Sequence, residues 1–373
     1  MIPFTWLPSH VAAIRPESMP MSPLFDRETA SDVLSGHDVW DHWPVLSTTG
    51  ALAPVAGGQL VIALAAPRLP DPDDRHAIAR LWLFHRSPTS WRDLGPVFAD
   101  DAAPGSRQWS GSAIISDAGE AVRLFFTAVG GCGEPPFNFA QRLFETTAQL
   151  RISDGVPSLA DWSAPIECAR PDGLVYQSDM GGGGAIGTIK AFRDPFWFRD
   201  ADRDEDWLLF TASDAGAHSS WNGVVGAAKR IDDAWVLQPP IVSAIGLNNE
   251  LERPHVVIHR GQVYLFWSTQ AKVFANPGPR GPTGLYGVVA DSWGAPWRPI
   301  NGTALVFANP GIAPTQAYSF QVLPNLTVWS FADMPGIWTL PPDPAARRAA
   351  FAGGPAPVLR LALDGDRAAL MPS

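Results

Sequence analysis

Short apolar runs bounded by turn residues recur along the whole chain, and they constrain its fold more than any other feature. Each run is rich in β-branched and aromatic side chains and is flanked by Gly, Pro, Asp or Asn, which is typical of β-strands. Clear examples are 60–66, 81–84, 122–127, 207–211 and 263–267. The 34 glycines and 37 prolines are spread throughout rather than gathered in one linker. The sequence therefore predicts an all-β chain.

A weak internal repeat suggests how these strands are grouped. The clearest copies begin at Trp207 and Tyr264, and a fainter copy begins at Leu124. Each has a buried strand, then a strand that contains glycine in the two clear copies (Gly223–Ala228 and Leu285–Ala290), then an outer strand with tryptophan. Units of a few strands that recur every ~60–80 residues are typical of propeller blades.

We therefore expect a single five-bladed β-propeller domain over residues 1–373, with an irregular segment at 1–30. The innermost strands of a propeller converge on a central axial pocket, where we expect the active site. A two-sheet sandwich is the alternative all-β fold, but it does not account for the repeat. Helical patterns are scarce, and the best short candidates are Pro135–Gln149 and Pro344–Phe351.

The charge balance limits the possible partners. The net charge is −10, and the 27 Lys and Arg residues form no basic run. This argues against nucleic acid and against an anionic membrane surface, both of which attract basic patches. A neutral sugar is compatible with it, and some of the 16 tryptophans could stack on sugar rings. A small-molecule sugar is the partner we expect, and the oligomeric state is left open.

Targeting and redox signals are sparse. Residues 1–8 have neither a basic start nor an apolar core, so we expect no conventional signal peptide. The compartment stays open between the cytoplasm and export without a cleavable leader. The chain has no long uncharged apolar run, so we expect no membrane span. Cys132 and Cys168 could form one disulfide, but two free thiols are the favoured state.

Three acidic residues set among aromatic or basic neighbours are the strongest candidates for chemistry. They are Asp41, Asp194 and Glu252, in the segments 38–44, 192–195 and 249–254. They are far apart in sequence, but the inner strands of a propeller would bring them together. Three carboxylates at one place suit the cleavage of a glycosidic bond: one attacks or steadies the sugar, one moves a proton and one braces the ring.

Other polar motifs have simpler, non-catalytic interpretations. The run Gly181–Gly184 lacks the Lys-Ser/Thr of a phosphate loop and is expected to be a plain loop. Ser110 lacks the G-x-S-x-G pattern, so we expect it to donate hydrogen bonds and not to act as a nucleophile. We expect Asp38 at a turn or strand start, His42 in a packing role, and His255 on an inner strand, directed away from the pocket. No cluster has zinc spacing.

Five segments, in this order, resemble glycoside hydrolase family 68, which comprises levansucrases, inulosucrases and bacterial β-fructofuranosidases. The segments are Val39–Pro44, Gln108–Ala113, Phe192–Pro195, Glu250–Pro254 and Gln316–Ser319. The resemblance spans most of the chain and implies a five-bladed propeller with a deep axial pocket.

The resemblance also implies roles for individual residues. Asp41 would be the nucleophile that forms a covalent fructosyl-enzyme, Glu252 the acid/base, and Asp194 the stabiliser of the transition state. A retaining mechanism of this kind needs the carboxyl groups of Asp41 and Glu252 about 5–5.5 Å apart. The implied substrate-binding residues are Trp40, Trp109, Ser110, Arg193, Glu250, Gln270 and Tyr318, of which Glu250 and Tyr318 would also orient the acid/base.

Some positions depart from the family pattern. Gln270 stands where relatives carry Arg or His, at a position implied to govern elongation of the polymer. Thr211 replaces a usual acidic residue and Phe320 a usual His. Asn249 stands where calcium-binding members carry Asp, so we expect neither calcium nor any other cofactor.

The resemblance thus implies a retaining, sucrose-cleaving fructosyltransferase that makes short oligosaccharides rather than long polymer. A mainly hydrolytic β-fructofuranosidase is the first alternative. An inverting hydrolase from related five-bladed families and a non-catalytic sugar-binding propeller also stay open. The inverting enzyme would need a wider gap between its carboxylates.

Overall fold

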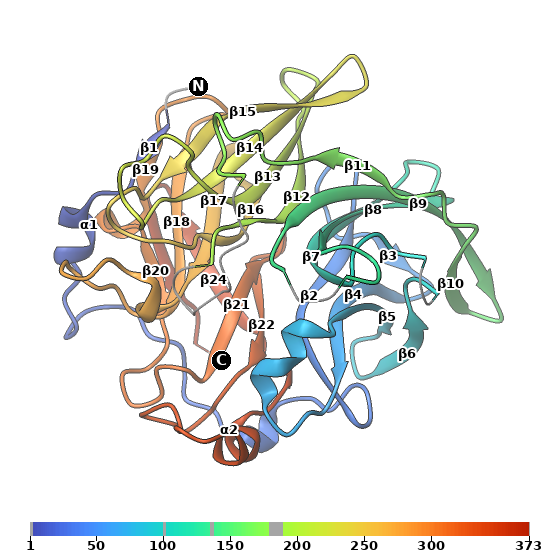
Figure 1. The fold of residues 1–373 in the computed structure, drawn as a ribbon, viewed down its shortest axis with the longest axis horizontal. Helices are drawn as coiled ribbons and strands as arrows, with labels where there is room; N and C mark the ends of the chain where they lie inside the picture. Colours follow the sequence, from blue (N-terminus) through green and yellow to red (C-terminus); the bar gives the residue numbers. More distant parts are fainter. Residues whose placement is uncertain (1–2, 100–101, 135–137, 179–188, 373) are drawn as a thin grey trace.

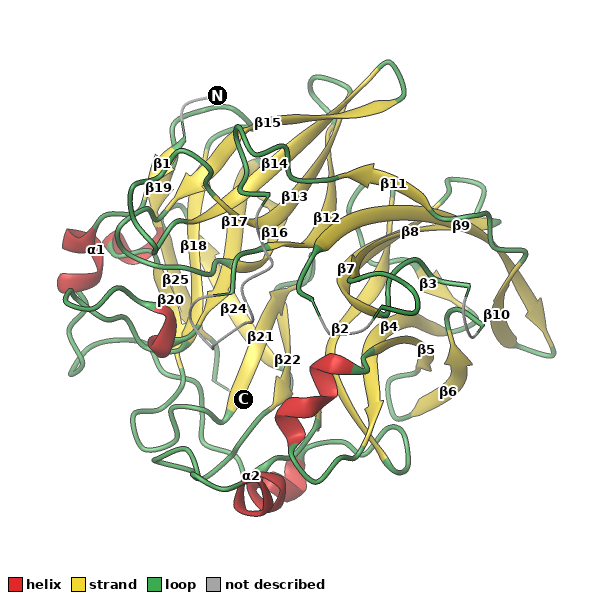
Figure 2. Cartoon of the chain, viewed as in Figure 1, coloured by secondary structure: helices red, strands yellow, loops and turns green. Residues whose placement is uncertain are grey.

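The computed structural model describes residues 3–99, 102–134, 138–178 and 189–372 (Figure 1). The all-β prediction is confirmed, since strands dominate the described chain (Figure 2). The described α-helices are two short ones, α1 (Pro8–Ala12) and α2 (Pro344–Ala350). Helix α2 confirms the helix predicted at 344–351. Neither helix has the length and apolar character needed to span a membrane, within the part of the chain that is described.

The helix predicted over Pro135–Gln149 is wrong. Residues 141–149 instead form the first part of strand β9 (Gln141–Ser153), and they pair with the whole of β8 (Ala121–Val129). Leu143, Phe144 and Ala148 of β9 are buried in the core. Long-range pairing and burial of these side chains override a local pattern that is compatible with either structure.

The described strands form one ten-stranded and three five-stranded sheets. The ten-stranded sheet consists of two antiparallel groups, which are joined where β2 and β7 pair in parallel. The first group contains β2 (His37–Ser47), β3 (Pro54–Val55), β4 (Gly58–Pro67), β5 (Arg80–Arg86) and β6 (Trp91–Pro96). The second contains β7 (Arg107–Ile115), β8, β9, β10 (Val156–Ala160) and β11 (Ile166–Ala169).

Each five-stranded sheet is a further group. The third contains β12 (Phe192–Asp200), β13 (Glu205–Ser213), β14 (Gly223–Ile231), β15 (Ala234–Ser243) and the N-terminal β1 (Phe4–Thr5). The fourth contains β16 (Glu252–His259), β17 (Gln262–Thr269), β18 (Gly284–Ala290), β19 (Arg298–Pro299) and β20 (Leu305–Ala308). The fifth contains β21 (Ala317–Val322), β22 (Thr327–Ala332), β23 (Gly354–Pro355), β24 (Leu359–Asp364) and β25 (Arg367–Leu370).

The predicted repeat corresponds to these groups. Its strands at 124–127, 207–211 and 264–267 are β8, β13 and β17, each the second strand of its group. The tryptophans of the outer strands are less regular. Trp235 lies in β15, whereas Trp162 follows β10 and Trp297 precedes β19. The hydrophobic core fills the spaces between neighbouring groups.

The first strands of the groups lie around a common centre. β7 contacts β2 and β12, β16 contacts β12 and β21, and β2 contacts β22 of the last group. The ring is therefore closed between the first and last groups, and the chain colour in Figure 1 passes around the molecule from blue to red. Side chains that these five strands direct inward must share one central space.

Each of these five strands carries a β-bulge where its pairing with the next strand shifts. Bulges bend a strand and re-aim its side chains, and they often lie beside active sites. The bulges fall at Trp40–Trp43, Trp109–Gly111, Arg193–Phe196, Glu252–His255 and Tyr318–Gln321. Four of the five contain a non-glycine residue with positive φ: Asp41 (46°), Asp194 (62°), Arg253 (48°) and Ser319 (62°). This conformation is costly for such residues and tends to cluster at functional sites.

The buried guanidinium of Arg253 ties three parts of the ring together. Its Nη1 donates to the carbonyl (3.1 Å) and hydroxyl (2.8 Å) of Ser319. Its Nη2 donates to the carbonyl of His42 (3.1 Å) and to Oε1 of Gln321 (2.9 Å). The same guanidinium lies over the ring of Trp43. Arg253 thus links β16 to both β21 and β2, across the closure of the ring.

Two histidines near the motifs are buried in the core. The His42 ring packs against Trp91 and Trp329, and burial lowers its pKa to about 3. This confirms its predicted packing role. His255 packs against Phe196 and Phe266, and its Nε2 accepts a hydrogen bond from the amide of a β21 residue.

The two cysteines are both free thiols. Cys132 is exposed, and its thiol donates weakly to the carbonyl of Gly105 (3.3 Å). Cys168 is partly buried, and burial raises the pKa of its thiol. Of the two possibilities left open by the sequence, the structure therefore has the unbridged one.

Asp38 lies at the start of β2, as predicted, and its side chain is fully buried. Nη1 and Nη2 of Arg348 donate to its two carboxylate oxygens at 2.6 and 3.0 Å. Arg348 belongs to α2, so this two-point ion pair attaches the C-terminal helix to the first strand of the ring.

Replacing Arg348 with Met should lower the free energy of unfolding by about 3 kcal/mol, because it leaves the buried carboxylate of Asp38 without its main partner. Urea denaturation would measure this. Arg151→Met is the matched control, because the Arg151–Asp161 pair is exposed and should contribute less than about 1 kcal/mol. Equal effects of the two substitutions would contradict a structural role for the Asp38–Arg348 pair.

Candidate active site

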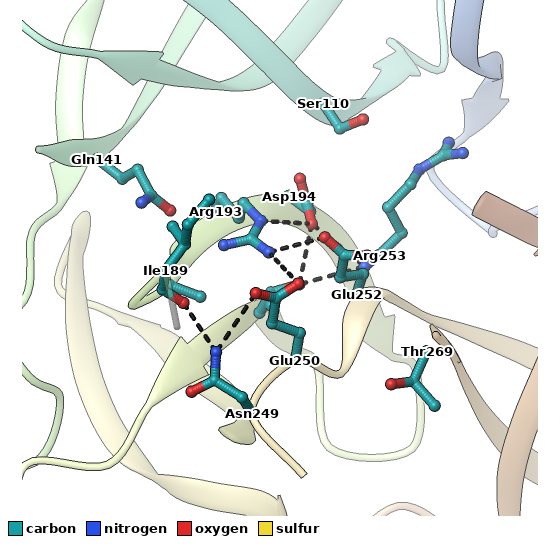
Figure 3. A network of polar contacts seen from close by, with 12 residues as sticks. Ser110, Gln141, Ile189, Arg193, Asp194, Asn249, Glu250, Glu252, Arg253 and Thr269 are labelled. Carbon is teal, nitrogen blue, oxygen red and sulfur yellow. Dashed lines mark hydrogen bonds and ion pairs between the residues drawn. The ribbon is translucent and has the colours of Figure 1, made fainter. Parts of the chain in front are cut away.

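The guanidinium of Arg193 lies at the centre of a cluster of acids (Figure 3). Arg193 belongs to β12, and only 7% of its side chain is exposed. Its Nη2 donates to Oε1 of Glu252 at 2.7 Å and lies 3.4 Å from Oε2 of Glu250. Its Nε lies 3.8 Å from Oδ2 of Asp194. Burial alone would lower the pKa of Arg193, but these three carboxylates together raise it above its ordinary value.

Glu252, the first residue of β16, is held on both sides. Arg193 binds one carboxylate oxygen, and the hydroxyl of Tyr318 donates to the other. Tyr318 is buried in β21, and burial together with the charge of Glu252 raises its pKa well above the usual value. The carboxylate of Glu252 therefore has a fixed orientation, as expected for a group that must transfer a proton along one direction.

Asp194 occupies the bulge of β12 and is tied to its neighbours through several groups. Its Oδ2 accepts hydrogen bonds from the hydroxyl of Thr211 (2.9 Å) and the amide of Arg253 (3.3 Å). Burial raises the pKa of Asp194 to about 6; Arg193 opposes this shift, and the charges of Glu252 and Asp41 add to it.

Asp41 occupies the bulge of β2. The hydroxyl of Ser110 donates to its Oδ2 at 3.0 Å, which agrees with the predicted hydrogen-bonding role of Ser110. The hydroxyl of Thr127 donates to the carbonyl of Ser110 (3.0 Å) and accepts from the amide of Asp194 (2.9 Å). Thr127 of β8 thus connects β7, which carries the partner of Asp41, to β12, which carries Asp194 itself. Hydrogen bonds through Ser110 and Thr127 therefore connect Asp41 to Asp194. Arg193 contacts both Asp194 and Glu252, so the three predicted acids belong to one network of polar contacts.

Glu250 lies beside Glu252 and is also buried. Its amide donates to Oδ1 of Asn248 (2.8 Å), and its Oε1 accepts from Nδ2 of Asn249 (3.3 Å). Burial and the charge of Glu252 raise the pKa of Glu250 to about 7, while Arg193 partly offsets the shift. Glu250 is therefore able to hold a proton near neutral pH.

Trp40 and Trp109 are buried beside the acids, each next to a bulge. His76, which the sequence did not single out, lies against both of them. Its ring centroid is 5.7 Å from that of Trp40 and 6.5 Å from that of Trp109, and its carbonyl accepts from the indole of Trp109 (3.1 Å). His76 lies in a 3₁₀ helix, Pro72–Ala77, between β4 and β5.

His76 is exposed as a residue, but one side of its ring packs against Trp40 and Trp109. Partial removal of the ring from water, followed by the charges of Arg75, Lys272 and Arg193, holds the pKa of His76 well below the usual value. His76 is therefore neutral near pH 7, and its imidazole has one donor and one acceptor nitrogen.

Gln270, the residue predicted to affect elongation of the product, comes directly after β17 and is half-buried. It precedes a 3₁₀ turn, Ala271–Val273. The charge of Lys272 in that turn acts on Glu250 and His76, so the turn borders the site. Phe320, by contrast, is packed in the core against Phe307. The run Gly181–Gly184 lies outside the described residues.

Neighbouring Asp and Glu carboxyl groups are the catalytic groups of most glycoside hydrolases. A profile described as Levansucrase/Invertase, which represents glycoside hydrolase family 68, matches residues 18–228 and 219–371. The chain therefore belongs to this family, and the resemblance seen in the sequence is confirmed.

Individual relatives agree with this assignment. A levansucrase of Zymomonas mobilis is 31% identical, over 88% of this chain and 81% of its own length. A levansucrase of Pseudomonas syringae pv. actinidiae is 29% identical, with the same two coverages. Among solved structures, an inulosucrase from Halalkalicoccus jeotgali bound to kestose is similar with a TM-score of 0.90 and 34% identity, over 99% of this chain and 95% of that one.

Replacing Thr211 with Val should raise the pKa of Asp194 by about one unit above its present value of about 6, because the lost hydrogen bond stabilises the ionised carboxylate. Thr211→Ser keeps the hydroxyl and should leave the pKa nearly unchanged. Carbon NMR titration of protein labelled at the aspartate carboxyl groups measures both. A pKa that stays the same in the Val variant would contradict the hydrogen bond.

Proposed function

We propose that the protein is a retaining, sucrose-cleaving fructosyltransferase that passes the fructosyl unit to sugar acceptors or to water. The observation that carries this proposal is the fixed carboxylate of Glu252, held between Arg193 and Tyr318 in the same cluster as Asp194 and Asp41. The levansucrase and inulosucrase relatives support the choice of donor.

In the first step, Asp41 attacks the anomeric carbon of the fructosyl unit while Glu252 donates its proton to the glycosidic oxygen. The C–O bond to glucose breaks, glucose leaves with that proton, and the fructosyl unit is bound to Asp41 as an ester. In the second step, Glu252 takes a proton from water or from a sugar hydroxyl, and the resulting nucleophile releases the fructosyl unit from Asp41.

The neighbouring residues support these steps. The Ser110 hydroxyl holds one oxygen of Asp41, which leaves the other free to attack. Ionised Asp194 favours the positive charge that develops on the fructosyl ring. Glu250, whose pKa is about 7, keeps a proton close to Glu252 near neutral pH. Trp40, Trp109 and the neutral His76 would form the wall against which the sugar lies.

We further propose that the five strand groups are the blades of a five-bladed propeller and that the acids line a pocket on its axis. The closed ring of first strands and the bulge shared by all five support this arrangement. The chemistry is carried by side chains alone, so we propose that the enzyme works without a cofactor.

The products are proposed to be short fructooligosaccharides, with hydrolysis as the competing outcome. The support is Gln270, whose neutral amide replaces the Arg or His expected from the family resemblance. An amide offers fewer and weaker charge-assisted contacts to a growing sugar chain than a guanidinium does.

Asp41→Asn should lower kcat for sucrose by about 10⁴-fold or more while sucrose still binds, because the carboxamide has nearly the same shape but is a poor nucleophile. Glucose and fructose are measured separately, and binding is followed by calorimetry. Ser110→Ala removes only the supporting hydrogen bond and should cost about tenfold to a hundredfold. If Asp41→Asn keeps more than about one-hundredth of the wild-type kcat, Asp41 is excluded as the nucleophile.

Gln270→Arg should increase the share of fructosyl units transferred to sugars and lengthen the products, because a guanidinium can bind sugar hydroxyls through several donors. Chromatography of products at equal sucrose conversion measures this. Gln270→Ala is the control and should shift the balance toward hydrolysis. Identical product patterns in all three proteins would show that residue 270 does not contact the acceptor.

A further inference from the structure

The ammonium group of Lys190 is bound by oxygens from separate segments of the chain. Lys190 lies just before β12, and its Nζ donates to the carbonyl of Ser220, to Oδ1 of Asn222 (2.7 Å) and to Oδ1 of Asn249 (2.9 Å). The side chains of Asn222 and Asn249 are buried. A lysine ammonium has three N–H donors, and here each one has an oxygen partner.

These oxygens are of the type that bind hard metal cations. Carbonyl and amide oxygens are common calcium ligands, usually together with carboxylates. The three partners of Lys190 are neutral, and the positive charge between them belongs to the chain itself. Burial lowers the pKa of Lys190, and the nearby charge of Glu250 opposes that shift.

Asn249 connects this group to the acids, and Figure 3 shows its contacts with Ile189 and Glu250. While its Oδ1 accepts from Lys190, its Nδ2 donates to the carbonyl of Ile189 (3.0 Å) and to Oε1 of Glu250 (3.3 Å). Glu250 in turn lies 3.4 Å from the Arg193 nitrogen that binds Glu252. A continuous series of polar contacts therefore runs from Lys190 to the proposed acid/base.

We propose that Lys190 is an internal cation that takes the place of a bound divalent metal ion. It is a positioning residue: it fixes the amide of Asn249, which orients Glu250 and through it the Arg193–Glu252 pair. The residues do not fit calcium, because an ammonium already occupies the oxygens and none of the three is a carboxylate. The catalytic part of this inference rests on the proposed function.

The direct test exchanges the two kinds of cation. Lys190→Ala/Asn249→Asp removes the ammonium and adds a carboxylate, so added calcium chloride should raise its Tm by about 5 °C or more in a saturable way that a chelator reverses. In wild type and in Asn249→Asp alone, Lys190 still fills the space, and calcium should not change the Tm. No calcium response in the double variant, or the same response in the single variant, would overturn the proposal.

The positioning role is tested by kinetics with sucrose. Lys190→Ala should lower kcat about tenfold to a hundredfold with little change in KM, as is usual for groups that orient a catalytic residue. Methylammonium should restore part of kcat, whereas methanol should not. Lys229→Ala is the matched control, because Lys229 of β14 pairs with Glu205 of β13 and has no contact with the acid cluster among its described partners, so kcat should stay unchanged. Unchanged kcat in Lys190→Ala would exclude the positioning role.

The outcome of the calcium test does not depend on the outcome of the kinetic test. The calcium response is read from Tm and needs no substrate, so it remains decisive if wild type does not cleave sucrose. Conversely, loss of the sucrose activity on Asp41→Asn would stand whether or not Lys190 acts as proposed. If Lys190→Ala does not fold, Asn249→Leu keeps the lysine but removes its connection to Glu250, and it should show the same fall in kcat. Wild-type kcat in that variant would contradict the proposal.

Discussion

One buried guanidinium makes this site possible. Carboxylates repel one another and are costly to remove from water, so several of them stay buried together only around a compensating cation. Arg193 supplies that cation for Asp194, Glu250 and Glu252. It does not neutralise them fully, and the pKa values of Asp194 and Glu250 remain raised to about 6 and 7. The cluster therefore changes its protonation in the range where acid/base chemistry is useful.

The backbone brings these groups together through one repeated irregularity. Every first strand of the ring has a bulge at the corresponding place, and the acids or their partners occupy these bulges. Positive φ at Asp41 and Asp194 is unfavourable in isolation, and the surrounding hydrogen bonds and ring closure through Arg253 offset it. Lys190 adds a further fixed contact beside the acids, because it holds Asn249 in place without a metal ion.

Much of this could be predicted from the sequence, because apolar runs and the motifs around Asp41, Asp194 and Glu252 are local signals. What could not be predicted depends on contacts between distant segments. The part of β9 mistaken for a helix is a strand because of its pairing with β8. His76 follows the charged run Asp73–Arg75 and looks like part of a solvated loop. Lys190 has no motif, and its oxygen partners come from residues 220, 222 and 249.

Direct capture of the covalent intermediate is the most decisive measurement. Glu252→Gln would be incubated with fructosyl fluoride, whose leaving group needs no protonation, then quenched in acid and mapped by peptide mass spectrometry. Without the general base, release is slow and the intermediate should accumulate. We expect the added mass of one fructosyl unit on the peptide that contains Asp41. A label on another residue, or no label together with an inverted product, would contradict the account.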